Sequence, residues 1–242
     1  TGLISLGSAV RIRPSLPLLM KQKYKFLFKR FLYYFYGEKF FKRLHYDWSK
    51  YPSRIQIIQS IIDKKNFKHY LEIGCDRDVN FSNIRADKKV GVDPIRGGTL
   101  RMTSDDFFKQ NNDKFDLIFL DGLHTYEQTI KDIDHSLKSL NNDGVIIIHD
   151  CLPKKIWNQI VPRIYGHWNG DVWKAIVHSR TYTHADTYTC VADHGLGVIF
   201  KRKNRNQLNL KVNFKNLKFS EYYYNHDEFM NPVAYKNLES IF

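Results

Sequence analysis

Asp121 and His124 stand three residues apart where an apolar run of the sequence ends, and this pair could bind a cation or move a proton. The run, Phe115–Leu120, has the composition of a buried strand, and the stretch FDLIFLDGLHTYEQ carries it into a loop. An imidazole exchanges its proton near neutral pH, and a neighbouring carboxylate can orient it. The alternative interpretation is a polar loop that follows a strand and takes part in no chemistry.

The elements that must position this pair are predicted by the pattern of the chain, in which short apolar runs alternate with amphipathic segments. The predicted strands cover residues 69–74, 89–94, 99–104, 115–121, 145–150, 187–192 and 196–202. The predicted helices cover residues 52–63, 125–140 and 172–179.

This alternation is typical of an α/β fold in which helices cover both faces of a mostly parallel sheet. The last two predicted strands are joined by Asp193–Gly195, which indicates a tight turn between antiparallel strands. The predicted fold is therefore a Rossmann-like, seven-stranded, mostly parallel sheet with a C-terminal antiparallel hairpin.

Polar residues gather where these strands end, and in an open sheet of this kind ligands bind beyond the carboxyl ends of the strands. The residues at those ends are Glu72, Gly74, Asp93, Ser104, Asp105, Asp121 and Asp150. A single acid at a strand end is commonly a turn former, but acids after four of the first five strands indicate a binding edge.

Asp93 follows Glu72 by about 20 residues, the spacing at which an acid bonds the ribose hydroxyls of a nucleotide-like cofactor. The sequence GxGxxG is absent, and Gly74 is followed by Cys-Asp-Arg-Asp instead. A pyrophosphate would require more glycine around it. A nucleoside cofactor without phosphates, such as S-adenosylmethionine, fits better.

Six segments, taken in order, carry a resemblance to a known family: YLEIGC, KKVGVDP, TSDDFF, FDLIFLDGLHTYEQ, GVIIIHDCLP and GDVWKAI. Over about residues 52–202 they resemble a class I S-adenosylmethionine-dependent methyltransferase, and most closely a bacterial group linked to glycan and secondary-metabolite genes. The resemblance implies that Glu72 and Gly74 lie near the methionine part, Asp93 on the ribose, and Ser104 with Asp105 near the adenine. The family's turn after Gly74 usually has further glycines, which Asp76, Asp78 and Asn80 replace here.

Methyl transfer to a hydroxyl requires an aligned nucleophile and removal of its proton. Asp121, also expected beside the cofactor, and Asp150 follow adjacent predicted strands and are candidate ligands for Mg²⁺, which prefers oxygen donors. His124 is the candidate base. Metal-dependent sugar and macrolide O-methyltransferases look similar here, although some have a second acid at the position of His149.

The function predicted from this resemblance is O-methylation of a hydroxyl on a sugar or small metabolite. Two alternatives stay open. The first is a metal-free methyltransferase acting on another acceptor, such as an amine. The second is a non-catalytic partner at a membrane surface or in glycan assembly, whose cofactor site has decayed. Trp168 and Trp173 could stack on a sugar ring or serve packing, and His149 is expected to be a core histidine at a strand end.

The composition bounds the cellular setting and the partners. The 242 residues carry a formal net charge of +13, concentrated in residues 11–54 and 201–218. Three cysteines without paired spacing favour a reducing cytoplasm. No apolar run reaches the roughly 20 residues of a membrane span.

We expect disorder over residues 1–20, a basic aromatic helical extension over 21–51, the methyltransferase domain over 52–202 and a C-terminal extension over 203–242.

Residues 21–48 alternate basic and aromatic side chains, with Tyr24, Phe28, Phe31 and Phe35 at helical spacing. Three interpretations compete for this segment: a helix packed on the main domain, a helix lying on an anionic membrane surface, and a nucleic-acid patch. No nucleic-acid-binding signature accompanies the charge, which disfavours the third.

Overall fold

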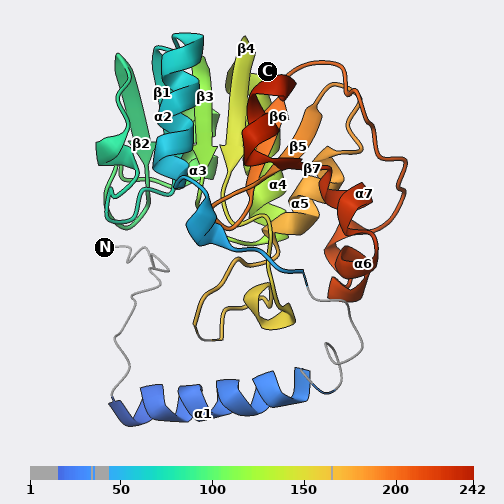
Figure 1. Ribbon diagram of the computed structural model, residues 1–242. Helices are drawn as coiled ribbons and strands as arrows, with labels where there is room; N and C mark the ends of the chain where they lie inside the picture. Colours follow the sequence, from blue (N-terminus) through green and yellow to red (C-terminus); the bar gives the residue numbers. More distant parts are fainter. Residues whose placement is uncertain (1–15, 34, 36–43, 165) are drawn as a thin grey trace.

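A seven-stranded sheet with the order β2-β1-β3-β4-β6-β5-β7 organises the chain (Figure 1). The computed structural model describes residues 16–33, 35, 44–164 and 166–242. The strands are β1 (His69–Ile73), β2 (Lys88–Val92), β3 (Phe115–Leu120), β4 (Leu140–Ile148), β5 (Asp186–Val191), β6 (Leu196–Phe200) and β7 (Pro232–Ala234). Among these strands β6 runs against its neighbours β4 and β5, and the other pairs are parallel.

Helices surround this sheet. The α-helices are α1 (Leu16–Tyr33), α2 (Arg54–Lys65), α3 (Ser104–Gln110), α4 (Tyr126–Ser139), α5 (Val172–Ser179), α6 (Phe219–Tyr224) and α7 (His226–Met230). The 3₁₀ helices are η2 (Trp48–Lys50), η3 (Phe81–Asn83), η4 (Ile156–Asn158), η5 (Phe214–Asn216) and η6 (Tyr235–Ile241). No helix among the described residues is both long and apolar enough to cross a membrane.

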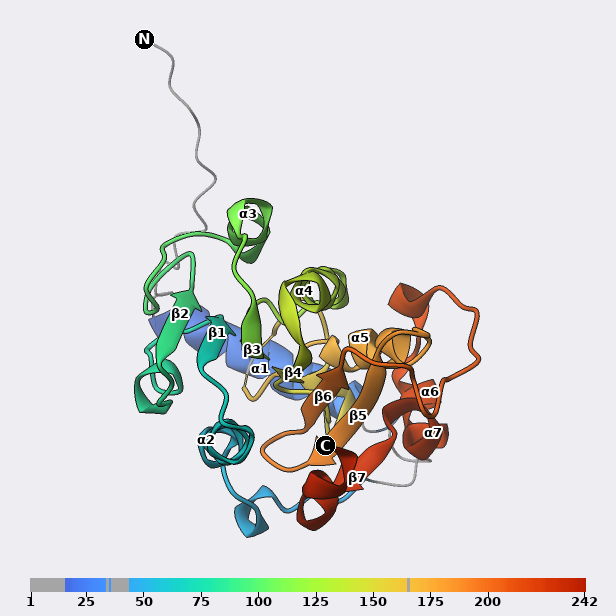
Figure 2. The same ribbon diagram turned by 90° about the horizontal axis from the view of Figure 1, so that it is seen from above.

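The two faces of the sheet bury two separate apolar clusters, because successive side chains of a strand point to opposite faces. In β3, Leu117 and Phe119 join the cluster formed with α2 and η6. Ile118 and Leu120 join the cluster formed with α3, α4 and α5. The view from above shows these helices on opposite sides of the sheet (Figure 2).

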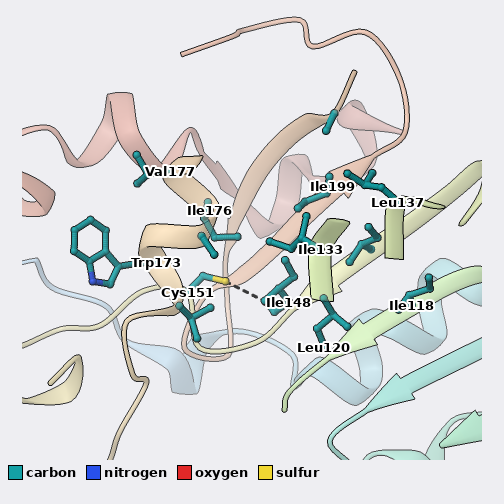
Figure 3. Packing of buried hydrophobic residues seen from close by; sticks show 14 of the residues in the cluster. Ile118, Leu120, Ile133, Leu137, Ile148, Cys151, Trp173, Ile176, Val177 and Ile199 are labelled. Atoms are coloured by element: carbon teal, nitrogen blue, oxygen red, sulfur yellow. Dashed lines mark hydrogen bonds between the residues drawn. The ribbon is translucent and has the colours of Figure 1, made fainter. Parts of the chain in front are cut away.

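The packing behind the candidate site is dense (Figure 3). Ile133 of α4 and Ile176 of α5 are fully buried against Leu120 and Ile148, the last residues of β3 and β4. Burying an isoleucine or leucine side chain contributes about 1.5–3 kcal/mol. The two strand ends that carry Asp121 and Asp150 therefore rest on a rigid support.

The predicted fold class is confirmed, with local differences. The predicted strand at 99–104 is wrong: Leu100 forms an isolated bridge with Val92, and α3 begins at Ser104. The chain folds back so closely that Thr99 and Leu100 both donate backbone hydrogen bonds to Gly91. The seventh strand is instead β7, which pairs with β5 near the C-terminus. β4 begins at Leu140, so it directly follows α4.

The two extensions differ in how they meet the sheet. Residues 203–242 wrap around the domain and bury side chains in both clusters, among them Tyr222, Met230 and Leu238. Residues 1–15, where disorder is expected, lie outside the described residues, and Leu16–Met20 form the start of α1. The predicted helix within 21–48 is α1 as far as Tyr33, while residues 36–43 are also outside the described part.

Candidate active site

The loop after β1 has the backbone of a glycine-rich turn although it has one glycine at its start. Gly74, Asp76 and Asp78 have φ angles of +91°, +47° and +61°. This left-handed region suits glycine, and aspartate is one of the few other residues that enter it. A Cβ on Gly74 would lie 2.3 Å from the carbonyl oxygen of Asp121, so the ends of β1 and β3 approach closely here.

A cavity of about 360 Å³ opens beside this loop, at the carboxyl ends of β1 and β2. Four of the residues expected at the cofactor line it, namely Gly74, Asp93, Ser104 and Asp105. Its lining also includes Ile95, Leu123 and Gln128, which the sequence did not single out. Ile95 and Leu123 are 66% and 60% exposed, an unusual state for large apolar residues beside strand ends. Two exposed apolar walls around polar groups suit a flat nucleoside base.

Asp93 is buried and already accepts several hydrogen bonds. Its carboxylate accepts from the backbone N–H groups of Asp76 (2.9 Å), Ile95 (2.8 Å) and Arg96 (2.9 Å). These bonds join the loops after β1 and β2. An ionised carboxylate has about four acceptor positions, so a position is left for a ribose hydroxyl.

Glu72 lies beneath the loop rather than in the cavity wall. It is 1% exposed, and its carboxylate accepts from Tyr70 Oη at 2.6 Å and from Asn80 Nδ2 at 2.7 Å. Burial raises the pKa of Glu72 to about 7, although these two hydrogen bonds act in the opposite direction. The structure places Glu72 in a role that supports the loop from inside.

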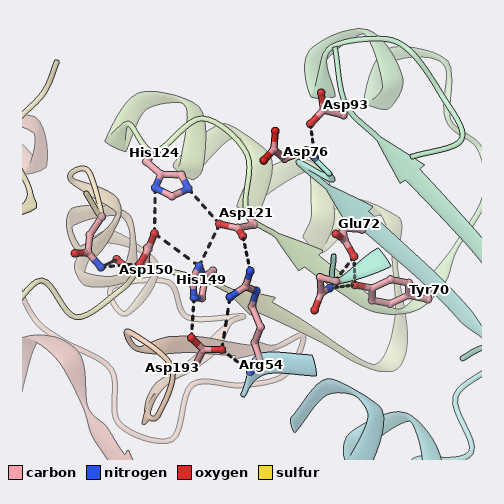
Figure 4. Close-up of polar contacts among 12 residues, drawn as sticks. Arg54, Tyr70, Glu72, Asp76, Asp93, Asp121, His124, His149, Asp150 and Asp193 are labelled. Carbon is pink, nitrogen blue, oxygen red and sulfur yellow. Dashed lines mark hydrogen bonds and ion pairs between the residues drawn. The ribbon is translucent and has the colours of Figure 1, made fainter. Parts of the chain in front are cut away.

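The Asp121–His124 pair lies close to Asp150 (Figure 4). His124 Nε2 is 3.1 Å from Asp121 Oδ1, and His124 Nδ1 is 3.3 Å from Asp150 Oδ2. Burial lowers the pKa of His124, but the hydrogen bond and charge of Asp121 outweigh it and the pKa is raised. The His124 side chain is 18% exposed, so one edge of the ring can still meet a substrate.

Asp150 has a backbone φ of +62°, a conformation that costs a non-glycine residue energy. Asn169 holds its side chain in place by donating from Nδ2 to Asp150 Oδ1 at 2.8 Å. The same loop presses on His124: a Cβ on Gly170 would lie 1.8 Å from the His124 carbonyl oxygen. Strained backbone of this kind is concentrated at functional sites.

His149 has the predicted position, but its contacts with three carboxylates were not predicted. It is a buried histidine at the end of β4, as expected, yet its Nδ1 lies 3.2 Å from Asp121 Oδ1 and 3.7 Å from Asp150 Oδ2. Its Nε2 is 3.4 Å from Asp193 Oδ1 in the β5–β6 turn. Burial lowers the pKa of His149, but the charges of Asp121 and Asp150 outweigh it and raise the pKa to about 10.

Arg54 and Asp193 complete this network from distant parts of the chain. The Arg54 backbone N–H donates to Asp193 Oδ2 at 2.5 Å, and its guanidinium lies 3.6 Å from the same carboxylate and 4.0 Å from Asp121. Burial favours the neutral form of Asp193, but His149 and Arg54 outweigh this effect and hold the pKa of Asp193 at about 2. Burial likewise opposes ionisation of Asp121, yet His149 and His124 keep its pKa well below the usual range.

The two candidate tryptophans have different positions. Trp168 stacks on the His124 ring, with ring centroids 5.3 Å apart and an interplanar angle of 15°. Trp173 is fully buried in the core, so its role is packing. Trp168 therefore fixes the plane of the His124 ring.

The donor atoms also fit a divalent cation. Asp121, His124 and Asp150 each offer an atom within 4.8 Å of the others, and His124 Nδ1 makes no hydrogen bond within the described part of the chain. Two carboxylates with one imidazole are donors that divalent ions accept. Asp150 belongs to a second such group with His167 and His194.

Comparison with known proteins finds a domain family that matches part of the chain. Residues 53–151 match the family model described as a methyltransferase domain. No curated protein matches the chain. The cofactor-bound structure of Rv0187 from MTB has 11% identity and a TM-score of 0.50, over 73% of this chain and 97% of that one. The SAH-bound methyltransferase PaMTH1 of Podospora anserina has 16% identity and a TM-score of 0.48, over 82% of this chain and 100% of that one.

The likeness to Rv0187 shows the fold, and the family match covers β1 to the end of β4, which carry the cavity and most of the acidic edge. The sheet order, the turn after β1 and the matched domain agree with one another. Residues 53–151 of the chain therefore resemble a methyltransferase domain, on a fold like that of Rv0187.

Proposed function

We propose that the protein transfers the methyl group of S-adenosylmethionine to a hydroxyl of a sugar or another small metabolite, with His124 as the base. The observation that carries the proposal is that the Asp121–His124 pair adjoins the cavity proposed for the cofactor. Gly122 and Leu123, which lie between the pair in sequence, line that cavity. A base next to the methyl donor is what a hydroxyl acceptor requires.

The residues of the chain divide the work as follows. Bound S-adenosylmethionine supplies a methyl group already activated on a sulfonium. Asp121 orients the His124 ring through the 3.1 Å contact, and Trp168 holds the plane of the ring. A nitrogen of His124 accepts the hydroxyl proton while the C–O bond forms and the C–S bond breaks. Asp93 is the proposed partner of the ribose, and Ser104 and Asp105, which also line the cavity, are the proposed neighbours of the adenine.

Magnesium assistance is the finer part of the proposal. Asp121 and Asp150 would hold the ion, with His124 close enough to join them. Such an ion lowers the pKa of a hydroxyl bound to it and orients it.

A metal-free reaction is the second candidate, and a specific observation favours it. His149 and Arg54 already place positive charge beside Asp121 and Asp193. With the carboxylates balanced in this way, His124 supported by Asp121 could act without a cation. Binding of Mg²⁺ at the same carboxylates would have to compete with the His149 proton.

Calorimetry separates these candidates. S-adenosylmethionine and S-adenosylhomocysteine are titrated into the protein with Mg²⁺ and with a chelator. A magnesium-dependent rise in heat or affinity in the presence of a hydroxyl acceptor supports the assisted reaction, and equal curves support the metal-free one. If neither nucleoside binds, the proposed function is wrong.

The role of His124 is tested by the His124→Ala variant, with exposed His184→Ala as the matched control. Turnover is followed as S-adenosylhomocysteine released in the presence of a panel of hydroxyl-bearing sugars and of matched amines. We expect His124→Ala to keep its affinity for S-adenosylhomocysteine and to lose about 10²- to 10⁴-fold in turnover. Unchanged turnover, or turnover with the amines alone, contradicts the proposal.

A further inference from the structure

The outward face of α1 carries a stripe of large apolar side chains. Met20, Tyr24, Leu27, Phe28 and Phe31, here called the α1 stripe, are between 45% and 66% exposed. At 100° per residue they occupy one arc of the helix, about opposite the buried Phe26. Phe35, 40% exposed, follows the helix and contacts the ring of Phe31 at 4.6 Å. Exposed apolar surface this concentrated marks an interaction site.

The inner side of α1 holds the helix on the loop that follows β4. Phe26 is 7% exposed, and the Arg30 guanidinium lies 4.8 Å over the ring of Trp157 in η4. A Cβ on Gly166 would lie 3.9 Å from Phe26. The stripe therefore points away from the domain because the opposite side is the packed one.

Basic residues border the stripe on both sides. The helix LPLLMKQKYKFLFKRFLY contains five basic residues and no acid. Lys23 falls on one flank of the stripe, and Lys25 and Lys29 fall on the other. An apolar face edged by lysines is the pattern of helices that lie in a membrane interface.

The position of α1 adds a direction to this surface. The loop that carries η4 begins just after Asp150, and α1 lies beyond it on the side of the carboxyl ends of the parallel strands (Figure 1). A partner bound to the α1 stripe would therefore lie on the same side of the protein as the candidate site.

We propose that the α1 stripe docks the protein on an anionic membrane surface, with α1 lying parallel to that surface. The apolar residues enter the headgroup boundary, and the flanking lysines meet acidic lipid headgroups. A second copy of the chain fits less well, because two α1 helices would bring their like charges together. A nucleic acid fits less well, because the centre of the surface is apolar and its charge lies at the edges.

The test measures binding of the full chain to vesicles by sedimentation, with neutral phosphatidylcholine vesicles compared with vesicles that also contain phosphatidylserine. Binding is expected to need the acidic lipid and to weaken as salt rises. Lys23→Gln, Lys25→Gln and Lys29→Gln together are expected to lower the partition coefficient about 100-fold, since each charge near the surface contributes about fivefold. Phe28→Ser with Phe31→Ser is expected to reduce it as well while leaving the charge unchanged.

The matched control removes three charges elsewhere on the exposed surface through Lys88→Gln, Lys203→Gln and Lys211→Gln. Circular dichroism and binding of S-adenosylhomocysteine confirm that each variant is folded, and this keeps a failed variant distinct from a failed proposal. In Phe28→Trp, quenching by brominated lipid reports whether the stripe itself enters the bilayer.

Three results would overturn the proposal. Equal losses in the α1 and control variants would mean that the net charge alone attracts the protein. If the protein does not bind acidic vesicles, the α1 stripe is not a membrane-docking surface. A dimer in sedimentation velocity that dissociates in the Phe28→Ser, Phe31→Ser variant and does not bind lipid would assign the stripe to a second copy of the chain.

Discussion

His149 is the residue on which the charges of the candidate site depend. Its imidazole contacts Asp121, Asp150 and Asp193 from a position that is 7% exposed. Removing one partner from a buried charged group leaves the other partners without compensation, at a cost of about 3–5 kcal/mol.

We therefore predict that His149→Ala lowers the free energy of unfolding by about 3 kcal/mol or more. Urea unfolding of the variant and the parent measures the difference. His184→Ala, at an exposed position, is the control and should change stability by less than about 0.5 kcal/mol. A loss below about 1 kcal/mol in His149→Ala would show that Arg54 alone balances these acids.

Glu72 gives a prediction about pH, because burial raises its pKa from 4.5 to about 7. Between these two values the folded protein binds a proton that the unfolded chain releases. Stability from this group is therefore fully present below about pH 4.5 and is lost as the pH rises to about 7. The loss is on the order of 3 kcal/mol, at about 1.4 kcal/mol per pKa unit.

In Glu72→Gln the amide oxygen can still accept from Tyr70, but nothing titrates. The stability of the Gln variant relative to the parent should rise between pH 5 and pH 7 and stay constant above it. Urea unfolding at pH 5, 6, 7 and 8 gives the difference curve, in which the other titrating groups cancel. A flat difference curve would mean that Glu72 has an ordinary pKa in the folded protein.

At the scale of elements, the loop after β1 combines two functions in its aspartates. Asp78 has a φ of +61°, and its Oδ1 accepts from the backbone N–H of Gly98 at 2.6 Å. Asp76, with a φ of +47°, pairs with Arg96. Where a glycine would supply the backbone shape alone, these residues also tie the loops after β1 and β2 together.

Substitutions at Asp78 should therefore follow a definite order of stability. Asn keeps both the left-handed preference and an acceptor, so Asp78→Asn should cost less than about 1 kcal/mol. Gly keeps the backbone shape and loses a hydrogen bond to a charged group, about 1.5–3 kcal/mol. Ala loses the bond and adds strain of about 1–2 kcal/mol, and so should be the least stable. Thermal or urea unfolding gives the order, and Ala at least as stable as Gly would contradict it.

Sequence patterns predict best those elements whose side chains are buried on every side. β1, β3 and the end of β4 are mostly apolar, and both faces of the sheet are covered there, so the apolar runs located them. The prediction of a strand at 99–104 was wrong because Gly97 and Gly98 turn the chain back onto Gly91. β7 escaped notice because its residues are few and include a proline at a sheet edge.

The site was predictable to the extent that it follows from strand ends. The acids Asp93, Asp121 and Asp150 lie at one edge because parallel strands end together. The contribution of Asp193 comes from an antiparallel turn, and that of Arg54 from the start of α2, so only the tertiary structure brings them to His149. The glycine-like backbone of Asp76 and Asp78 was also hidden, since residue type alone does not give φ.

At the scale of the whole molecule, the C-terminal residues close the sheet that the domain begins. β7 pairs in parallel with β5, and Leu238 and Ile241 of η6 pack against the α2 face. Arg202 Nη2 donates to the carbonyl oxygen of Ile241 at 2.6 Å, which links this segment to the end of β6. These contacts predict that the extension unfolds together with the half of the domain that carries the candidate site.

A chain that stops after Asn231 should accordingly lose stability throughout and not just at its end. It would leave the β5 edge unpaired and expose the α2 face where Leu238 and Ile241 are now buried. Each of these side chains contributes about 1.5–3 kcal/mol on burial, and an open edge strand promotes association.

Leu238→Ala should alone cost about 2–4 kcal/mol, whereas exposed Asn237→Ala next to it should cost less than about 0.5 kcal/mol. Urea unfolding is followed by tryptophan fluorescence, to which Trp173 on the opposite face contributes, and by far-ultraviolet circular dichroism. If the chain is one cooperative unit, Leu238→Ala lowers the urea midpoint equally by both signals. If the C-terminal segment unfolds independently, the fluorescence midpoint stays that of the parent.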